Sequence, residues 1–274
     1  KEDYVIASDT DSVYITFDKL VSRSFGTTKM ASENESSLER ERVVTFLDRL
    51  AREKIEPFID KSYEDLAEYI AAYDQKMSMK REVIADKGIW TAKKRYILNA
   101  WDVEGVKYKE PQLKMMGIES VRSSTPAPCR QKIKDALHII MSGNEKMLND
   151  FIQNFREEFM NLPPEEIAYP RSVNGLSKFS DTSQLFAKGA PIHVKGAILY
   201  NHLVRKKKIG HKYPFIQEGD KIKFLHLKSP NIYQCSSISF MTRLPKELTL
   251  HNSIDYDTQF EKSFIEPLNF ILQK

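Results

Sequence analysis

Apolar and polar positions alternate at the start of the chain in the manner of two short strands. Apolar, β-branched runs over 4–7 and 12–17 flank the polar residues 8–11. Such runs on both sides of a polar turn predict a β-hairpin. One residue separates the two aspartates of this turn, Asp9 and Asp11, and we expect both carboxylates to project from the tip of the hairpin.

The next segment changes from the period of a strand to that of a helix. Residues 22–37 are rich in Ser, Thr, Gly and Asn and predict a loop. Ser36 begins a capping box, and apolar residues at helical spacing follow it over 43–51 and 58–73. Pro57 interrupts the pattern, so a kinked or restarted helix is expected there.

Strand periodicity then returns. Runs at 80–85 and 95–101 are bounded by turn signals at 86–88 and at Glu104-Gly105, and they predict a second antiparallel unit. Strands that pair locally and are segregated from the helices indicate an α+β class rather than repeated βαβ units. We therefore expect an antiparallel sheet with flanking helices over residues 1–117.

The second part of the chain, 118–274, is predicted to be mainly helical with a small β-containing insert. Helical stripes cover about 126–142 and 148–159, and a terminal helix covers roughly 254–272. A Gly-, Pro- and Lys-rich region of mixed pattern runs from 170 to about 248. The predicted boundary between the two parts is near Gly117.

Composition and charge narrow the class of protein. With 274 residues, 41% of them hydrophobic and 29% charged, the chain is typical of a soluble globular protein. No apolar run approaches the roughly 20 residues of a membrane span, and the two cysteines, Cys129 and Cys235, are too few for a disulfide framework. We expect a cytoplasmic protein with no membrane partner, in the host cell cytoplasm if the source is a phage.

The two kinds of charge are distributed unevenly. Residues 1–75 contain 10 Lys+Arg and 17 Asp+Glu, whereas residues 76–274 contain 32 and 21. Within the second part, residues 169–228 hold 12 Lys+Arg and three Asp+Glu. Such a basic stretch suits a polyanion such as nucleic acid, although an ordinary solvated basic face has the same composition.

The candidate chemistry begins with Asp9 and Asp11. Hard cations such as Mg²⁺ take oxygen ligands and keep open positions for phosphates, which a pair of carboxylates on a rigid turn supplies. Two metal ions about 3.5–4 Å apart can stabilise the attacking and leaving oxygens of phosphoryl transfer. The alternative is a surface turn that uses aspartate for local hydrogen bonds. The apolar strands on both sides favour the metal site.

A basic cluster, Lys93-Lys94-Arg95-Tyr96, lies at the start of the strand predicted at 95–101. Strand alternation would send Lys94 and Tyr96 to one face and Lys93 and Arg95 to the other. The cluster can contact a phosphate backbone, or its lysines can protect the edge of a sheet. The further basic run 205–208 suits either nucleic acid or a solvated loop. The six histidines lack the spacing of a zinc site, and no P-loop or Gly-x-Ser-x-Gly motif is present.

Two of these segments resemble motifs of a known family. Residues 5–12 are similar to the third palm motif of the family B DNA polymerases, and residues 90–96 are similar to their later Lys-Lys-Arg-Tyr motif. The resemblance is to the replicative polymerases of large tailed bacteriophages. It covers nearly the whole chain, in order, through four further segments: 80–85, 113–119, 123–126 and 262–268.

The resemblance implies domains and roles. Residues 1–117 would be the C-terminal half of the polymerase palm, and residues 118–274 would be the thumb. Asp11 would bind both Mg²⁺ ions of a two-metal site, Asp9 would lie beside them as a metal ligand with a lesser role, and Glu82 would be a nearby accessory catalytic carboxylate. The residues implied to bind DNA are Lys93, Lys94, Arg95, Tyr96, Ser123, Ser124, Lys178, Lys188 and Lys195.

The function implied is that of the C-terminal portion of a DNA-directed DNA polymerase, a nucleotidyltransferase. Its partners would be primer-template DNA, a deoxynucleoside triphosphate and the missing N-terminal polymerase part, with a sliding clamp bound only through a tail absent here. The first palm aspartate motif, the fingers motif and the exonuclease are not found, so we expect the chain alone to be inactive. Ala7-Ser8 also replaces the family's Tyr-Gly.

Two other classes of function are weighed against the polymerase. The chain could be a non-catalytic duplex-DNA-binding module or a subunit of a split polymerase. A two-metal nuclease is disfavoured, because the sequence shows no further carboxylate cluster and no histidine placed to act as a base.

Overall fold

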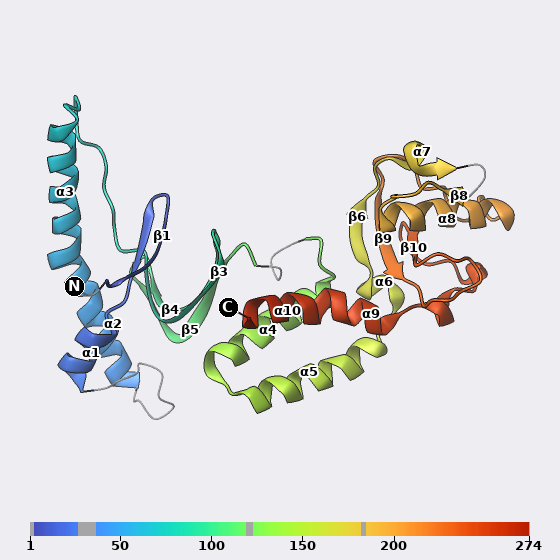
Figure 1. Ribbon diagram of the computed structural model, residues 1–274. Coiled ribbons are helices and arrows are strands. Elements are labelled where there is room, and N and C mark those ends of the chain that lie inside the picture. The colour runs from blue at the N-terminus through green and yellow to red at the C-terminus, as the bar shows by residue number, and fades with distance from the viewer. Residues whose placement is uncertain (1–2, 27–36, 119–122, 182–184, 274) are drawn as a thin grey trace. The chain divides into compact units, whose positions relative to one another are not determined.

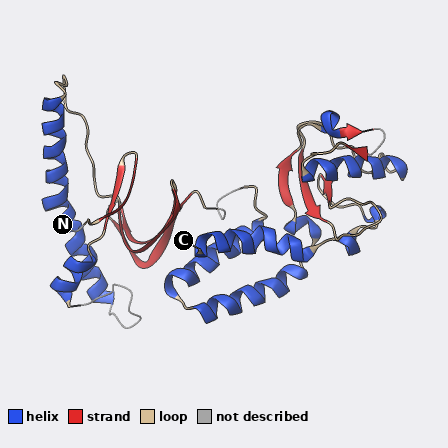
Figure 2. Ribbon diagram, viewed as in Figure 1, coloured by secondary structure: helices blue, strands red, loops and turns tan. Residues whose placement is uncertain are grey.

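The computed structural model describes residues 3–26, 37–118, 123–181 and 185–273. The chain divides into two compact units, Lys1–Gly117 and Ile118–Lys274 (Figure 1). Both units combine helices with antiparallel sheets (Figure 2), which confirms the predicted α+β class. Among the described residues, no helix is both long enough and apolar enough to cross a membrane.

The first unit contains a hairpin and a three-stranded sheet. The predicted hairpin is present and consists of β1 (Val5–Asp9) and β2 (Ser12–Ile15). The sheet has the order β3 (Val83–Ala92), β4 (Arg95–Val103), β5 (Val106–Met116), and both of its strand pairs are antiparallel. The turn predicted at Glu104-Gly105 joins β4 to β5, and both residues have positive φ, as a type I′ turn requires.

The turn predicted at residues 86–88 is wrong. These residues lie inside β3, where the pairing with β4 shifts register between Ala85 and Lys87. A β-bulge adds one residue to a strand without ending it, so it produces a turn-like sequence within a continuous strand. Gly88 makes room for the Trp90 ring, because a Cβ atom on residue 88 would lie 2.7 Å from two atoms of that ring.

The described residues of the first unit also form the helical segments α1 (Asp18–Phe25), α2 (Ser37–Leu50), η1 (Ala51–Ile55) and α3 (Glu56–Tyr69). The loop predicted at 22–37 is therefore wrong over its first residues, because α1 buries Val21 and continues to Phe25. The predicted cap, Ser36, lies outside the described residues. The last three segments follow one another directly, and the π-helical η1 precedes Pro57. Proline offers no N–H to the preceding turn, and a π segment accommodates that loss.

Helix α2 packs on the sheet through a small core. Val44 and Leu47 contact Ile84 of β3 and Trp101 of β4. Arg81 lies just before β3, and its guanidinium pairs with Asp48 of α2 and Asp102 of β4. Among the described residues, the first unit buries eight apolar side chains and the second buries 36, whereas 14 of the 19 large apolar side chains that are exposed belong to the first. The first unit thus leaves much of its apolar surface uncovered.

The helical part of the second unit agrees with the predicted stripes. Helices α4 (Ala127–Ser142) and α5 (Glu145–Met160) are joined by a short turn, and the terminal helix comprises α9 (Tyr256–Phe260), the π-helical η5 (Glu261–Ile265) and α10 (Glu266–Leu272). Phe155 of α5 lies at the centre of this part, with ring centroids 4.8 Å from Phe264 and 5.7 Å from Phe260. These aromatic contacts fix the terminal helix against α5.

The β-containing insert lies between α5 and α9. Its three-stranded sheet has the order β10 (Ser237–Phe240), β9 (Lys221–His226), β6 (Tyr169–Ser172). Helix α8 (Ile192–Lys206) packs on β10, where a Cβ atom on Gly196 would lie only 2.6 Å from Ser239 Oγ. The remaining elements are short: α6 (Pro164–Ile167), α7 (Leu176–Phe179), β7 (Ser180–Asp181), β8 (Leu185–Phe186), η3 (Lys246–Leu248) and η4 (His251–Ser253).

Candidate functional site

The tip of the β1–β2 hairpin holds the two predicted metal ligands. Asp9 is the last residue of β1, and Thr10 and Asp11 form the turn, with a positive φ of 54° at Thr10. The Thr10 hydroxyl donates a hydrogen bond to Asp9 Oδ1 at 3.0 Å, and Ser12 Oγ donates to the Asp9 carbonyl at 3.1 Å. Asp11 is exposed and Asp9 is half-buried. The expectation that both carboxylates project from the tip therefore holds only for Asp11.

The two faces of this hairpin differ in exposure. Ala7, Asp9, Ser12 and Tyr14 are half-buried, whereas Ile6 and its neighbours on the other face are exposed. Because Asp9 pairs with Ser12 and Ala7 pairs with Tyr14, the four half-buried residues share one face. Asp9 therefore lies on the same face of the hairpin as the Tyr14 ring.

Tyr14 joins the hairpin to the three-stranded sheet. Its ring makes edge-on contacts with the rings of Trp90 on β3 and Tyr96 on β4, and the ring centroids are 5.2 Å and 5.6 Å apart, respectively. Tyr14 therefore contacts both strands of the β3–β4 hairpin through its ring. The structure thereby brings together the segments 5–12 and 90–96, which the sequence analysis had selected independently.

The charges at this junction are mainly carboxylates. Burial raises the pKa of Tyr96, and the neighbouring Tyr14 and the negative charges of Glu82 and Asp9 raise it further. Glu82 forms an ion pair with Lys114 of β5. Lys114 is therefore the counter-charge of Glu82 in this unit.

The two aspartates have the chemistry of metal ligands. Asp9 and Asp11 offer the oxygen ligands that Mg²⁺ prefers, and their position at a hairpin tip leaves open positions for phosphate oxygens. Within the described part of the chain, no three His, Cys, Asp or Glu side chains are close enough together to hold a metal ion. The pair thus fits a Mg²⁺ site that takes another ligand from elsewhere.

Lys93 and Lys94 form the turn between β3 and β4, and both side chains are exposed. The prediction that strand alternation separates them onto two faces is wrong, because turn residues do not follow the strand period. Lys94 has a positive φ of 60°. Its carbonyl oxygen lies so close to Gly117 that a Cβ atom there would be 2.6 Å away, and Gly117 itself has a φ of 67°. Arg95 and Tyr96, the first residues of β4, are half-buried.

The other predicted DNA-binding residues belong to the second unit. Ser123 is exposed and Ser124 is half-buried, just before α4, and Lys188 is exposed in a turn. Nζ of Lys178 on α7 lies 5.2 Å from the centroid of the Phe179 ring, and Nζ of Lys195 on α8 lies 5.6 Å from the centroid of the Phe186 ring. The three lysines are thus presented by α7, by α8 and by the connection between them.

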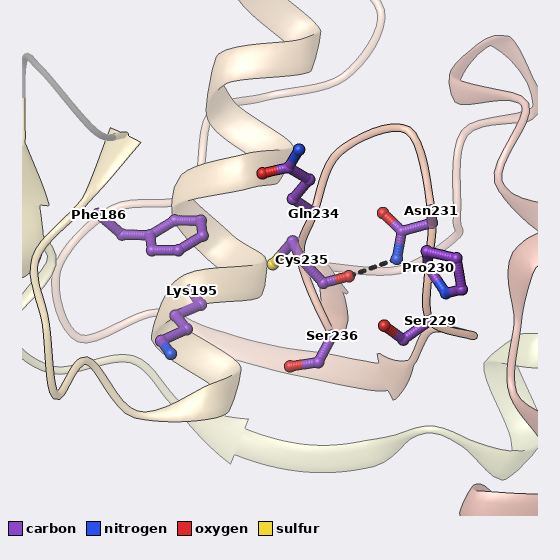
Figure 3. A pocket seen from close by; sticks show the side chains of 8 residues that line it. All are labelled: Phe186, Lys195, Ser229, Pro230, Asn231, Gln234, Cys235 and Ser236. Atoms are coloured by element: carbon purple, nitrogen blue, oxygen red, sulfur yellow. Dashed lines mark hydrogen bonds between the residues drawn. The ribbon is translucent and has the colours of Figure 1, made fainter.

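Lys195 also lines a pocket of about 260 Å³ (Figure 3). Asn231 Nδ2 donates to the Cys235 carbonyl at 2.7 Å, so this amide holds the loop at the pocket in shape. The other residues that line it are Phe186, Ser229, Pro230, Gln234 and Ser236. All of them belong to the second unit.

The sequence analysis missed two residues of the site in the first unit. Tyr14 follows Ser12 at the strand period, so alternation alone would have placed it on the face shared with Asp9. Lys114 lies within the segment 113–119, which carried the family resemblance but received no role. Its pairing with Glu82 depends on how β3 and β5 are placed in the sheet, and no local pattern shows this.

Comparisons with known proteins identify two similar phage proteins. The chain is 32% identical over 279 residues to the DNA-directed DNA polymerase of Enterobacteria phage T4, and 35% identical over 280 residues to that of Escherichia phage RB69. Each alignment covers 97% of this chain and 30% of the relative. No protein-family model matches the chain.

These relatives confirm the resemblance to the family B DNA polymerases of phages. The chain is a homologue of a segment of these enzymes, and it spans about 30% of the length of the relatives that it matches. More particularly, the similarity is to the polymerases of T4 and RB69 and extends over both units.

Proposed function

We propose that the chain is the C-terminal portion of a template-directed DNA polymerase. In this proposal residues 1–117 are the later half of the palm and residues 118–274 are the thumb. The chain contributes a metal-binding aspartate pair and a surface for duplex primer-template DNA to nucleotidyl transfer. The observation that supports this most strongly is the Tyr14–Trp90–Tyr96 contact, which brings the two-aspartate hairpin beside a hairpin whose turn is Lys93-Lys94.

The reaction proposed is attack by the primer 3′-hydroxyl oxygen on the α-phosphorus of a deoxynucleoside triphosphate, with pyrophosphate as the leaving group. Asp9 and Asp11 would hold Mg²⁺, which when bound neutralises charge on the phosphate oxygens. Lys93 and Lys94 would bind backbone phosphates and so fix the primer-template near the carboxylates. Tyr96, packed under Tyr14, would hold this basic turn at a constant distance from Asp9.

The lysines of the second unit would make further contacts with the duplex backbone. Lys178, Lys188 and Lys195 lie in the stretch 169–228, where basic residues far outnumber acidic ones. The cations of Lys178 and Lys195 lie over aromatic rings, which restricts their side chains without neutralising their charge. Phosphate contacts of this kind position a protein on DNA but do not read its sequence.

The chain would act together with the remainder of a polymerase. Two carboxylates without a third ligand make an incomplete metal site, and the first unit exposes a large share of its apolar side chains. Apolar patches of this extent usually mark a surface that another protein segment covers. The same observations favour the alternative, a subunit of a split polymerase whose other part is a separate chain. Expression of the two parts as separate chains, followed by size-exclusion chromatography, distinguishes a subunit from a segment that needs covalent continuity.

Replacement of Asp11 tests the proposed catalytic role. In a full-length polymerase in which this chain occupies the matched segment, we expect Asp11→Asn to reduce nucleotide incorporation at least about a thousandfold, since it removes charge that metal-bound phosphates require. DNA affinity should remain within about twofold, because the basic turn is unchanged. Single-turnover primer extension and DNA titration measure the two effects.

The matched control is Asp9→Asn, which should be milder because Asp9 is half-buried and its Oδ1 already accepts from Thr10. Equal incorporation by the wild type and Asp11→Asn would show that the metal ions are held elsewhere. An inactive wild type that still binds DNA would favour the duplex-binding module.

A further inference from the structure

We infer that Tyr14 is a positioning residue, which holds the Asp9–Asp11 hairpin in its working place against the three-stranded sheet. The inference rests on the proposed function and adds a residue to it. Tyr14 is not charged and would not bind metal or DNA through its ring. Its effect would be exerted through the placement of the two aspartates.

The hairpin needs contacts with the rest of the unit to stay in place. A two-stranded hairpin is marginally stable by itself, and the outer face of this one is exposed, with Val5 47% and Ile6 55% accessible. On its inner face Ala7 and Ser12 are small, and Asp9 is charged. Tyr14 is thus the large side chain through which this face can pack on the sheet.

The sheet has a surface shaped to receive the ring. Gly88 has no side chain, so the Trp90 ring lies across the strand at a distance that a Cβ atom would not permit. Tyr14 meets the Trp90 ring at 73° and the Tyr96 ring at 60°, both within the favourable range of edge-on contacts. Contacts with two rings on neighbouring strands fix the position of the Tyr14 ring on the sheet.

This contact links the aspartate pair to the basic turn, which lie far apart in the sequence. Trp90 precedes Lys93 and Lys94 on β3, and Tyr96 lies two residues after Lys94 on β4. Asp9 and Asp11 stand five and three residues before Tyr14, on the other side of the contact. A displacement of Tyr14 therefore moves the carboxylates relative to the basic turn, whereas the turn itself stays with its sheet.

The test uses Tyr14→Leu and Tyr14→Phe in the full-length polymerase described above. Misplacement of reacting groups by about 1 Å can cost a hundredfold in rate, so we expect kcat of Tyr14→Leu to fall between about tenfold and a hundredfold. The KM for nucleotide and the DNA dissociation constant should stay within about twofold. Tyr14→Phe retains both ring contacts and should keep kcat within about threefold.

A second readout does not depend on catalysis. In the 274-residue chain, hydrogen exchange of the β1 amides should become about tenfold or more faster in Tyr14→Leu, with the central strand β4 unchanged. Tyr73→Leu is the matched control, because Tyr73 is a fully exposed tyrosine of the same unit, and it should change neither readout.

The outcomes separate the inference from the proposed function. A wild type that neither extends primers nor binds DNA overturns both. If the wild type is active, unchanged kcat or unchanged β1 exchange in Tyr14→Leu overturns the role of Tyr14 alone. Equal loss of DNA affinity and kcat would also overturn it, since general unfolding rather than misplacement of the aspartates would then explain the variant.

Discussion

The Lys93-Lys94 turn shows how a single residue can be tested for contact with DNA. Both lysines are exposed at the end of the hairpin, so both can reach a phosphate backbone. A charge-assisted hydrogen bond contributes about 1.5–3 kcal/mol, which corresponds to at least tenfold in affinity. We expect Lys93→Ala and Lys94→Ala each to weaken primer-template binding by about tenfold.

Dissociation constants measured at one fixed salt concentration check this expectation. Lys109→Ala is the control, because Lys109 is an exposed lysine of β5 near the opposite end of the sheet. It should change binding by no more than a solvated surface residue does, about 0.5 kcal/mol. If both turn variants behave like this control, the proposed contact between the turn and DNA is wrong.

The residue scale also explains a difference between the two aspartates. Asp9 lies on the same face of the hairpin as Tyr14. Its negative charge contributes to the raised pKa of Tyr96, of which burial is the largest cause. Asp11 lies in the turn and is exposed. Only Asp11 is thus fully accessible for ligands, which supports its larger proposed role in metal binding.

At the scale of elements, Arg81 joins the helix α2 to the sheet. Its guanidinium pairs with Asp48 and with Asp102, whose side chain is only 1% exposed. Burial raises the pKa of Asp48, but the hydrogen bond and charge of Arg81 outweigh this and leave it below its usual value. The ion pair thus favours the charged form of a carboxylate at the helix–sheet junction.

Removal of this arginine should destabilise the first unit strongly. Arg81→Met leaves the buried Asp102 without its charge partner, and such a loss typically costs about 3–5 kcal/mol. The control is Arg52→Met, because the Arg52 side chain is 63% exposed in its pair with Asp48, and exposed pairs contribute about 0–1 kcal/mol. Urea unfolding followed by tryptophan fluorescence measures both variants, because both tryptophans, Trp90 and Trp101, belong to the first unit. Similar midpoints for the two would refute a structural role for the Arg81 network.

Two helices of the chain contain a π-helical segment just before a proline. Each of the two described π-helical segments, η1 and η5, ends in Ile and is followed by Glu-Pro, at Pro57 and at Pro267. In both places the helix continues beyond the proline. The missing N–H is accommodated by a wider turn, so the chain keeps one helix where a break would otherwise form.

At the scale of the whole molecule, the distribution of charge predicts a salt dependence for the proposed DNA binding. Residues 76–274 hold 32 Lys+Arg and 21 Asp+Glu. If about four to six phosphates are contacted, the logarithm of DNA affinity should fall with the logarithm of salt concentration with a slope of roughly −4 to −5. Fluorescence anisotropy of labelled duplex DNA at several salt concentrations gives this slope.

The same purified chain should not incorporate nucleotides by itself. Its described residues contain no complete cluster of metal ligands, and catalysis by two metal ions needs further carboxylates. Primer extension by the 274-residue chain alone, or an affinity for DNA that does not change with salt, would contradict this expectation.

Much of the fold could be predicted from the sequence because the responsible interactions are local. The alternation over 4–17 predicts the β1–β2 hairpin, and the apolar stripe over 148–159 predicts a helix that buries Leu148, Phe155 and Phe159. The Asp9–Asp11 spacing and the 93–96 cluster were also visible, since each lies within one short segment. Strand and helix periods and turn residues act over a few positions, so a single sequence reveals them.

Only the tertiary structure decided how these segments meet. The bulge at residues 85–87 changes the register of β3, and a shift of one residue moves every later side chain to the other face of a strand. The same periodicity that predicted the hairpin therefore could not show that Tyr14 contacts Trp90 and Tyr96. The sequence determined which residues are available for chemistry, whereas register and packing between distant segments decided which of them lie together.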